Sequence, residues 1–152
     1  MKYIFAALLL LPLAIHAAEN SPLDVTSDRL EVDQQNGHAV FIGNVKAVRG
    51  GITLTAMQAD VSYGTSKNSD IDTVVATGNV VITREGGDTA RGEKAVYTPS
   101  NGKLVLTGGT VTLTRGGHTV QGNRLDYDTV AGQAVMQGGG AGVRAHFQSG
   151  SK

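Results

Sequence analysis

The chain has 152 residues, with 21 Gly, 3 Pro, no Cys and no Trp, and its 13 basic and 13 acidic side chains give a formal net charge of zero. The absence of Cys excludes a disulfide scaffold and a Cys-ligated zinc site, and the balanced charge provides no basic surface for nucleic acid. Val and Thr are abundant, whereas Leu is sparse after residue 17. This composition favours strands, because β-branched side chains fit a pleated surface, and the length suits one domain.

The first predicted element is a secretory signal over residues 1–17. Lys2 supplies a positive charge, an apolar run follows over residues 3–15, and Ala17 provides a small residue at the expected cleavage point. The apolar run is shorter than the roughly 20 residues that a membrane-spanning helix needs. We therefore expect cleavage after Ala17, with a retained anchor as the alternative.

A repeated motif runs through the rest of the chain. It begins with Gly and recurs at separations of 35 and then 30 residues, at positions 43–45, 78–80 and 108–110. A second motif follows each copy and ends in Tyr63, Tyr97 or Tyr127, and a Gly-Gly pair lies between the two motifs. Self-similarity of this kind indicates stacked supersecondary units.

Each repeat predicts short strands in which apolar and polar residues alternate. This period of two is typical of an antiparallel sheet with one apolar face. Gly-containing turns are expected at residues 35–37, 50–51, 66–68, 86–87, 100–102 and 116–117, and a β-bulge is expected at Gly108-Gly109. The predicted inward face comprises Leu23, Val25, Leu30, Val32, Phe41, Val45, Ile52, Leu54, Val74, Val80, Ile82, Leu104, Leu106, Val111, Leu113, Leu125 and Tyr127.

The pattern of elements predicts an all-β protein. Many short strands separated by turns are typical of a sandwich, a jelly roll or a solenoid. The inward residues are mostly aliphatic, so they form either a filled core or an apolar trough between two sheets, and the alternation alone does not distinguish these. Pro22 precedes the first strand, which is expected to lie at a sheet edge.

No catalytic or metal-binding group is expected. The carboxylate pairs Asp70/Asp72 and Asp126/Asp128 are interpreted as solvated strand faces, and the histidines lack close metal-ligand spacing. No nucleophile-elbow or phosphate-loop sequence occurs. We therefore predict a protein that is not an enzyme and holds no cofactor.

The ordered motifs resemble those of a known family. PLDVTSD at 22–28 leads into AVFIGNV at 39–45, and ATGNV at 76–80 and GNRLDY at 122–127 follow. This set, behind a signal sequence, resembles the LptA family of periplasmic lipopolysaccharide-transport proteins with the OstA-like domain, over about residues 22–147. The resemblance implies an open, twisted β-jelly roll of short antiparallel strands, V-shaped in section, over residues 18–147, followed by a flexible tail over 148–152.

The resemblance also implies a function. Members shield the acyl chains of lipid A in the apolar interior and assemble head to tail, with copies of themselves and with inner-membrane-anchored and outer-membrane OstA-like domains. The inward residues above then become lipid-binding positions, with Leu23, Val25 and Phe41 at positions that match the family, and the protein is expected in the periplasm. The near-zero charge predicts that the phosphorylated head stays in solvent. The alternative is a structural β-repeat or adhesin-like filament protein with a filled core, and a carbohydrate-active jelly-roll enzyme is a third hypothesis.

Overall fold

The structure is a computed structural model, and it describes residues 21–64 and 70–149. Within these residues there are strands and no helices, so the all-β prediction is confirmed. Residues 1–17, predicted to form the signal, lie outside the described residues. The strands are β1 (Leu23–Thr26), β2 (Arg29–Asp33), β3 (His38–Arg49), β4 (Ile52–Tyr63), β5 (Ile71–Arg84), β6 (Thr89–Thr98), β7 (Lys103–Arg115), β8 (His118–Asp128), β9 (Gln133–Gln137) and β10 (Arg144–His146).

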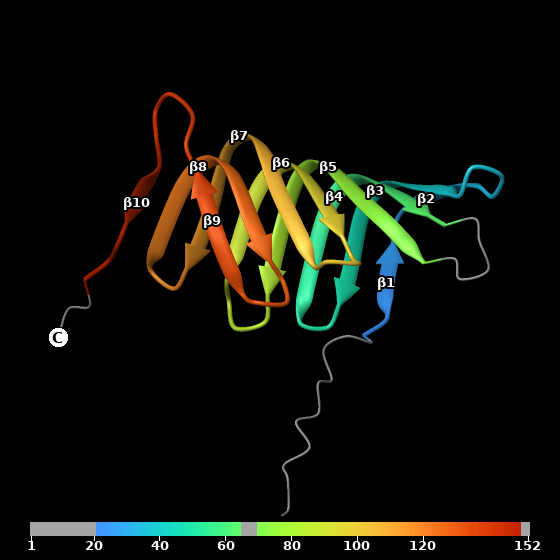
Figure 1. Cartoon of the computed structure of the whole chain (residues 1–152), viewed down its shortest axis with the longest axis horizontal. Helices are drawn as coiled ribbons and strands as arrows, with labels where there is room; N and C mark the ends of the chain where they lie inside the picture. Colours follow the sequence, from blue (N-terminus) through green and yellow to red (C-terminus); the bar gives the residue numbers. More distant parts are fainter. Residues whose placement is uncertain (1–20, 65–69, 150–152) are drawn as a thin grey trace, which may run out of the picture.

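All of these strands belong to one antiparallel sheet (Figure 1). The strands β3 to β8 follow one another both in sequence and in space, and within the described residues short turns join β3 to β4 and each pair of successive strands from β5 to β8. The turns predicted at 35–37, 50–51, 86–87, 100–102 and 116–117 are confirmed, while the one at 66–68 lies outside the described residues. The sequence analysis missed β9 and β10, which follow the third repeat.

The pairing of the long strands is interrupted along one line that crosses the sheet. The expected bulge at Gly108-Gly109 is confirmed, and the neighbouring strands are irregular at the same level. The register shifts occur between residues 42 and 45, 55 and 58, 77 and 80, 91 and 94, and 107 and 111. Because a bulge bends its strand, aligned bulges crease the whole sheet along this line.

The repeated motif at the start of each unit supplies the backbone that the crease needs. Gly43 and Asn44 have φ values of 78° and 45°, and Gly78 and Asn79 have 83° and 47°. Two successive left-handed residues are required, and Gly and Asn are the residue types that adopt this conformation most readily. Gly108 and Gly109 take the same places in the third unit. The repeated motif is therefore explained by the backbone bend that it permits, without a role in ligand binding.

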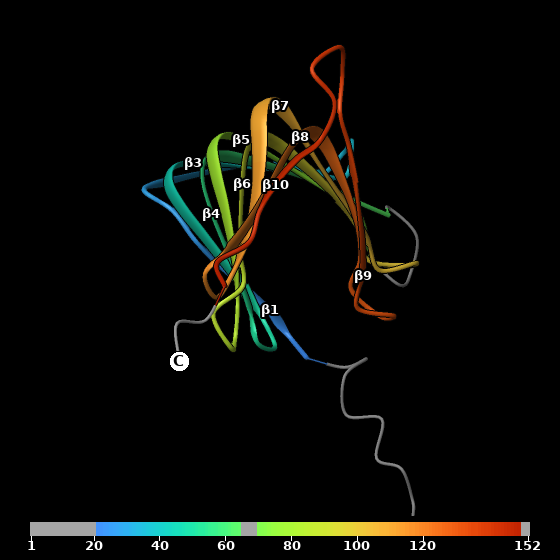
Figure 2. The same ribbon diagram turned by 90° about the vertical axis from the view of Figure 1, so that its left-hand side faces the viewer.

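The sheet folds along the crease into two facing walls (Figure 2). One wall ends in Arg49, Arg84 and Arg115, and we call it the arginine wall; β1 and β10 pair with it. The other wall contains Tyr63, Tyr97 and Tyr127 at its free margin, and we call it the tyrosine wall; β2 and β9 pair with it. The two walls give the twisted, V-shaped jelly roll that the sequence analysis predicted.

The core fills the vertex of the V. The largest fully buried side chains are Leu106, Val45, Val80 and Val111, all beside the crease. In the tyrosine wall the central strands contribute Ala59, Ala76 and Ala95 to the same inward row. These small side chains let the walls approach each other near the crease, so the vertex is a packed core.

Replacement of Gly78 by Ala tests the crease. A Cβ at Gly78 would lie 2.9 Å from the Met57 side chain, at a φ of +83°. We expect Gly78→Ala to lower the free energy of unfolding by about 1–3 kcal/mol, measured by urea denaturation. Gly140→Ala is the control, since a Cβ there meets no atom within 4 Å and no positive φ is imposed. Equal stability of the two variants would contradict the requirement for a left-handed residue.

Candidate functional site

The inward faces of both walls are lined by continuous rows of apolar side chains. Directly opposed residues of an antiparallel pair lie on the same face of a sheet, so the register defines each row. The tyrosine wall carries the row Leu30, Phe41, Ala59, Ala76, Ala95, Leu106, Leu125 and Met136. The arginine wall carries the row Val25, Ala47, Leu54, Ile82, Ala90, Leu113, Val120 and Ala145.

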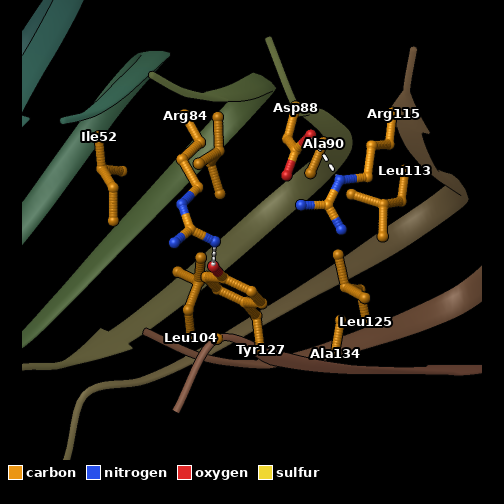
Figure 3. Close-up of a pocket in the computed structure, with 12 residues that line it drawn as sticks. Ile52, Arg84, Asp88, Ala90, Leu104, Leu113, Arg115, Leu125, Tyr127 and Ala134 are labelled. Carbon is orange, nitrogen blue, oxygen red and sulfur yellow. Dashed lines mark hydrogen bonds and ion pairs between the residues drawn. The ribbon is translucent and has the colours of Figure 1, made fainter. Parts of the chain in front are cut away.

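A cavity of about 130 Å³ lies between the walls, between the packed vertex and the mouth of the V. Aliphatic side chains from both walls form most of its lining, as Figure 3 shows. The predicted inward residues that line it are Ile52, Ile82, Leu104, Leu113, Leu125 and Tyr127. The interior is therefore filled at the vertex and hollow toward the mouth, which combines the two possibilities that the sequence left open.

The remaining predicted residues occupy other parts of the inward face. Val45, Val80, Leu106 and Val111 are buried at the vertex. Leu54 packs against that core, and Val74 forms a second, smaller cluster together with Phe41. Leu23 and Val25 are half-buried on β1. The structure thus places these residues on one apolar surface and brings six of them around the cavity.

Leu30 and Val32 face the same side as the rest but are exposed. They lie opposite Phe41 and Ala39 of β3, yet 52% and 53% of their surfaces are accessible. The cause is their place in the sheet, because β2 pairs only with β3 and no described strand covers its other edge. A second hollow, of about 740 Å³, lies toward this end of the molecule and is lined by Leu23, Arg49, Asp70, Ile71, Asp72 and Pro99, among others.

The mouth of the V is crossed by hydrogen bonds between arginine and tyrosine. The Arg84 guanidinium donates to the Tyr127 hydroxyl at 2.6 Å (Figure 3), and Arg49 donates to the Tyr97 hydroxyl at 3.3 Å. Arg115 forms an ion pair with Asp88 at 3.2 Å. The first two bonds join opposite walls, so they tie the mouth partly closed over the cavity.

These bonds also demonstrate how far the sheet is folded. Thr83, beside Arg84, lies in register with Thr119 of β8 through Thr89 and Thr114. Tyr127 is eight residues farther along β8, which at about 3.3 Å per residue would place it more than about 20 Å away in a flat sheet. Only the crease brings the two side chains into contact.

Sequence reasoning missed the arginines at the mouth. Arg49, Arg84 and Arg115 each end a strand next to a Gly-containing turn, once in every repeat. Repetition at this position was an available signal, but a charged residue before a turn is ordinarily solvated. Only the inward orientation, which depends on the register after the bulge, distinguishes these residues from surface charges.

The two carboxylate pairs singled out in the sequence have different surroundings. Asp126 accepts two hydrogen bonds from Arg124, which lower its pKa. Asp128 accepts a 2.7 Å bond from the Lys103 ammonium, and backbone N–H groups of the following turn donate to its other oxygen. The Lys103 bond, followed by the bonds from the turn, lowers the pKa of Asp128 to about 2. Asp126 and Asp128 thus bond to neighbouring groups on the outer face of the sheet, whereas Asp70 and Asp72 line the second hollow.

The depressed pKa of Asp128 predicts a pH dependence of stability. Its folded pKa of about 2 lies below the ordinary 3.8, so its contribution is present above about pH 4 and disappears as the pH falls toward 2. We expect Asp128→Asn to unfold at lower urea than the wild type at pH 7 and to converge with it near pH 2. Asp24→Asn, at an exposed position outside the described ion pairs, is the control. A urea difference independent of pH would contradict the assignment.

Two further features bear on the kind of site. Across residues 21–64 and 70–149, no group of three or more His, Cys, Asp or Glu side chains is arranged to hold a metal ion. Among the same residues no helix is long and apolar enough to cross a membrane. The side chains that line the cavity are mostly aliphatic, with guanidinium, phenol and carboxylate groups at the mouth.

Comparison with known proteins assigns this architecture. The model of the family described as LptA/(LptD N-terminal domain) LPS transport protein matches residues 24–133. The chain belongs to this family. The match covers the strands from β1 into the start of β9 and so includes most of both walls and every residue that lines the cavity except Ala134. The resemblance stated from the motifs is confirmed.

Two further comparisons report proteins that are similar to this chain. An uncharacterized protein of Rhizobium meliloti (strain 1021) is 34% identical over 98 residues, which make up 60% of this chain and 52% of that protein. The chain thus spans about half the length of this curated relative. The crystal structure of LptH from Pseudomonas aeruginosa, described as the LptA homologous periplasmic component of a lipopolysaccharide transport device, has a TM-score of 0.75 at 20% identity and covers 87% of this chain and 99% of LptH. This likeness confirms the fold.

Proposed function

We propose that this protein is a periplasmic carrier and bridge for lipopolysaccharide, and that it performs no catalysis. The observation that carries the proposal is the apolar cavity between two facing walls, in a member of a lipopolysaccharide-transport family. Acyl chains of lipid A enter between the walls, where the predicted inward residues outside the packed vertex are their contacts. The signal over residues 1–17 delivers the chain to the periplasm.

The physics of the cargo fits such a cavity. Exposing acyl chains to water costs about 0.8 kcal/mol per methylene group, so a carrier must cover them. Contacts with Ile, Leu and Ala side chains are nondirectional, which lets a chain slide from one position to the next. Among the side chains that line the cavity, the polar groups lie at its mouth. The interior therefore offers no hydrogen bonds that a moving acyl chain would have to break.

A photo-crosslinking amino acid at Leu113 tests the lipid contact. Leu113 lines the cavity, whereas Lys46 is exposed on the outer face of β3. In living cells we expect an adduct with lipopolysaccharide at Leu113 and none at Lys46, detected by immunoblot. Silence at both positions, with both variants correctly folded and located, would favour the alternative of a β-repeat filament with a filled core.

The two ends of the sheet support the assembly part of the proposal. At one end β1 and β2 each pair only with β3, and at the other β9 and β10 each pair only with β8. Their outer edges carry backbone groups that can pair with another strand. Apolar side chains are exposed at both ends, including Leu30 and Val32 on β2 and Val135 on β9. We infer head-to-tail pairing with copies and with partner domains that share this fold.

Charges placed on the β2 edge test the assembly. We expect Leu30→Asp combined with Val32→Asp to shift the protein toward monomer, because a desolvated carboxylate at a strand junction is costly. The measurement is sedimentation velocity over a range of concentrations. Met57→Asp is the matched control, since Met57 is 61% exposed but lies on β4, which is paired along both edges. Loss of association in the control alone, or identical sedimentation of all forms, would contradict docking at β2.

A further inference from the structure

Arg84, at the mouth of the cavity, takes part in none of the ion pairs among the described residues. Among the residues the structure describes, Arg29, Lys103, Arg115 and Arg124 each lie within 4.0 Å of a carboxylate. Arg84 belongs to none of these pairs, and its hydrogen bond goes to the neutral Tyr127 hydroxyl. A guanidinium has five N–H donors, so most of the binding capacity of Arg84 remains for another acceptor.

The surroundings of Arg84 favour an anion more than those of Arg49. Beside Arg84, the carboxylate of Asp88 is engaged by Arg115, which leaves Arg84 as the unneutralised charge of the cavity lining. Arg49 also bonds a tyrosine, but Asp70 and Asp72 line the same hollow as Arg49. The two equivalent positions of the repeat thus have opposite local charge.

We propose that Arg84 binds a phosphate group of the glycolipid cargo at the cavity mouth, and that Tyr127 holds this guanidinium in place when no cargo is bound. The inference rests on the proposed function, because it requires acyl chains in the cavity below. A phosphate carries negative charge and can accept two parallel bonds from one guanidinium, so it adds ion-pair attraction that the single bond to the uncharged phenol lacks. The phosphate therefore displaces the phenol.

The size of the cavity links binding to opening. A space of about 130 Å³ admits only a short stretch of acyl chain, so larger cargo requires the walls to separate at the mouth. Separation breaks the Arg84–Tyr127 bond, which joins β5 to β8 across the opening. The phosphate then takes the place of Tyr127 as the hydrogen-bond partner of Arg84. Binding of the cargo thus offsets the free energy lost when the mouth opens.

The experiment compares two probes on protein carrying a photo-crosslinker at Leu113. One probe is purified lipopolysaccharide, and the other is the same glycolipid after enzymatic removal of its phosphates. We expect Arg84→Gln to weaken apparent affinity for the phosphorylated probe by about tenfold, while affinity for the dephosphorylated probe equals or exceeds that of the parent because the tie across the mouth is absent. Circular dichroism confirms that each variant is folded at the temperature of the assay.

Two further variants separate phosphate binding from closure of the mouth. Arg91→Gln removes an exposed arginine from the outer face of β6 and should change neither affinity. Tyr127→Phe removes only the competing acceptor, so its affinity for the phosphorylated probe should equal or exceed that of the parent. If Tyr127→Phe weakens binding as Arg84→Gln does, the tie between the walls is what matters, and phosphate recognition is overturned.

The outcomes also distinguish this inference from the proposed function. If both probes crosslink at Leu113 and Arg84→Gln changes neither affinity, or lowers both equally, the phosphate site is wrong while lipid carriage stands. If neither probe crosslinks to the parent protein, lipid carriage fails and the phosphate site fails with it.

Discussion

The interior of this protein depends on one backbone constraint, the alignment of bulges across successive strands. A sheet of this size with uninterrupted ladders would twist without folding onto itself. Here the pairing breaks at the same level from β3 to β8, and the left-handed residues at the start of each repeat permit the bend. The packed vertex, the cavity and the contacts across the mouth all follow from the resulting angle between the walls.

Much of the fold could be predicted from the sequence because its determinants are local. Alternation of apolar and polar residues identified the strands, and Gly-containing turns identified the hairpins. The polar outer face of the sheet includes a row of threonines that lie side by side across five strands: Thr53, Thr83, Thr89, Thr114 and Thr119. Periodicity also placed the inward residues on one surface, although it did not separate vertex from cavity.

The rest depended on contacts between distant residues. Arg84 and Tyr127 are 43 positions apart and meet only because the sheet is creased. The exposure of Leu30 followed from the end of the sheet at β2, and β9 and β10 escaped notice because the repeat is degraded there. The zero net charge of the chain argues against nucleic-acid binding, but a net charge does not show how charges are distributed over the surface. Balanced composition coexists with a row of arginines along the margin of one wall.

The repeat has a consequence for the dimensions of the molecule. Each unit adds one hairpin, and neighbouring strands in a sheet are about 4.8 Å apart, so each unit lengthens the trough by about 10 Å. The cross-section does not change, because every unit brings its own bend, inward aliphatics and terminal arginine. The sequence therefore encodes the two dimensions separately: the number of units sets the length of the trough, and the residues within a unit set its cross-section.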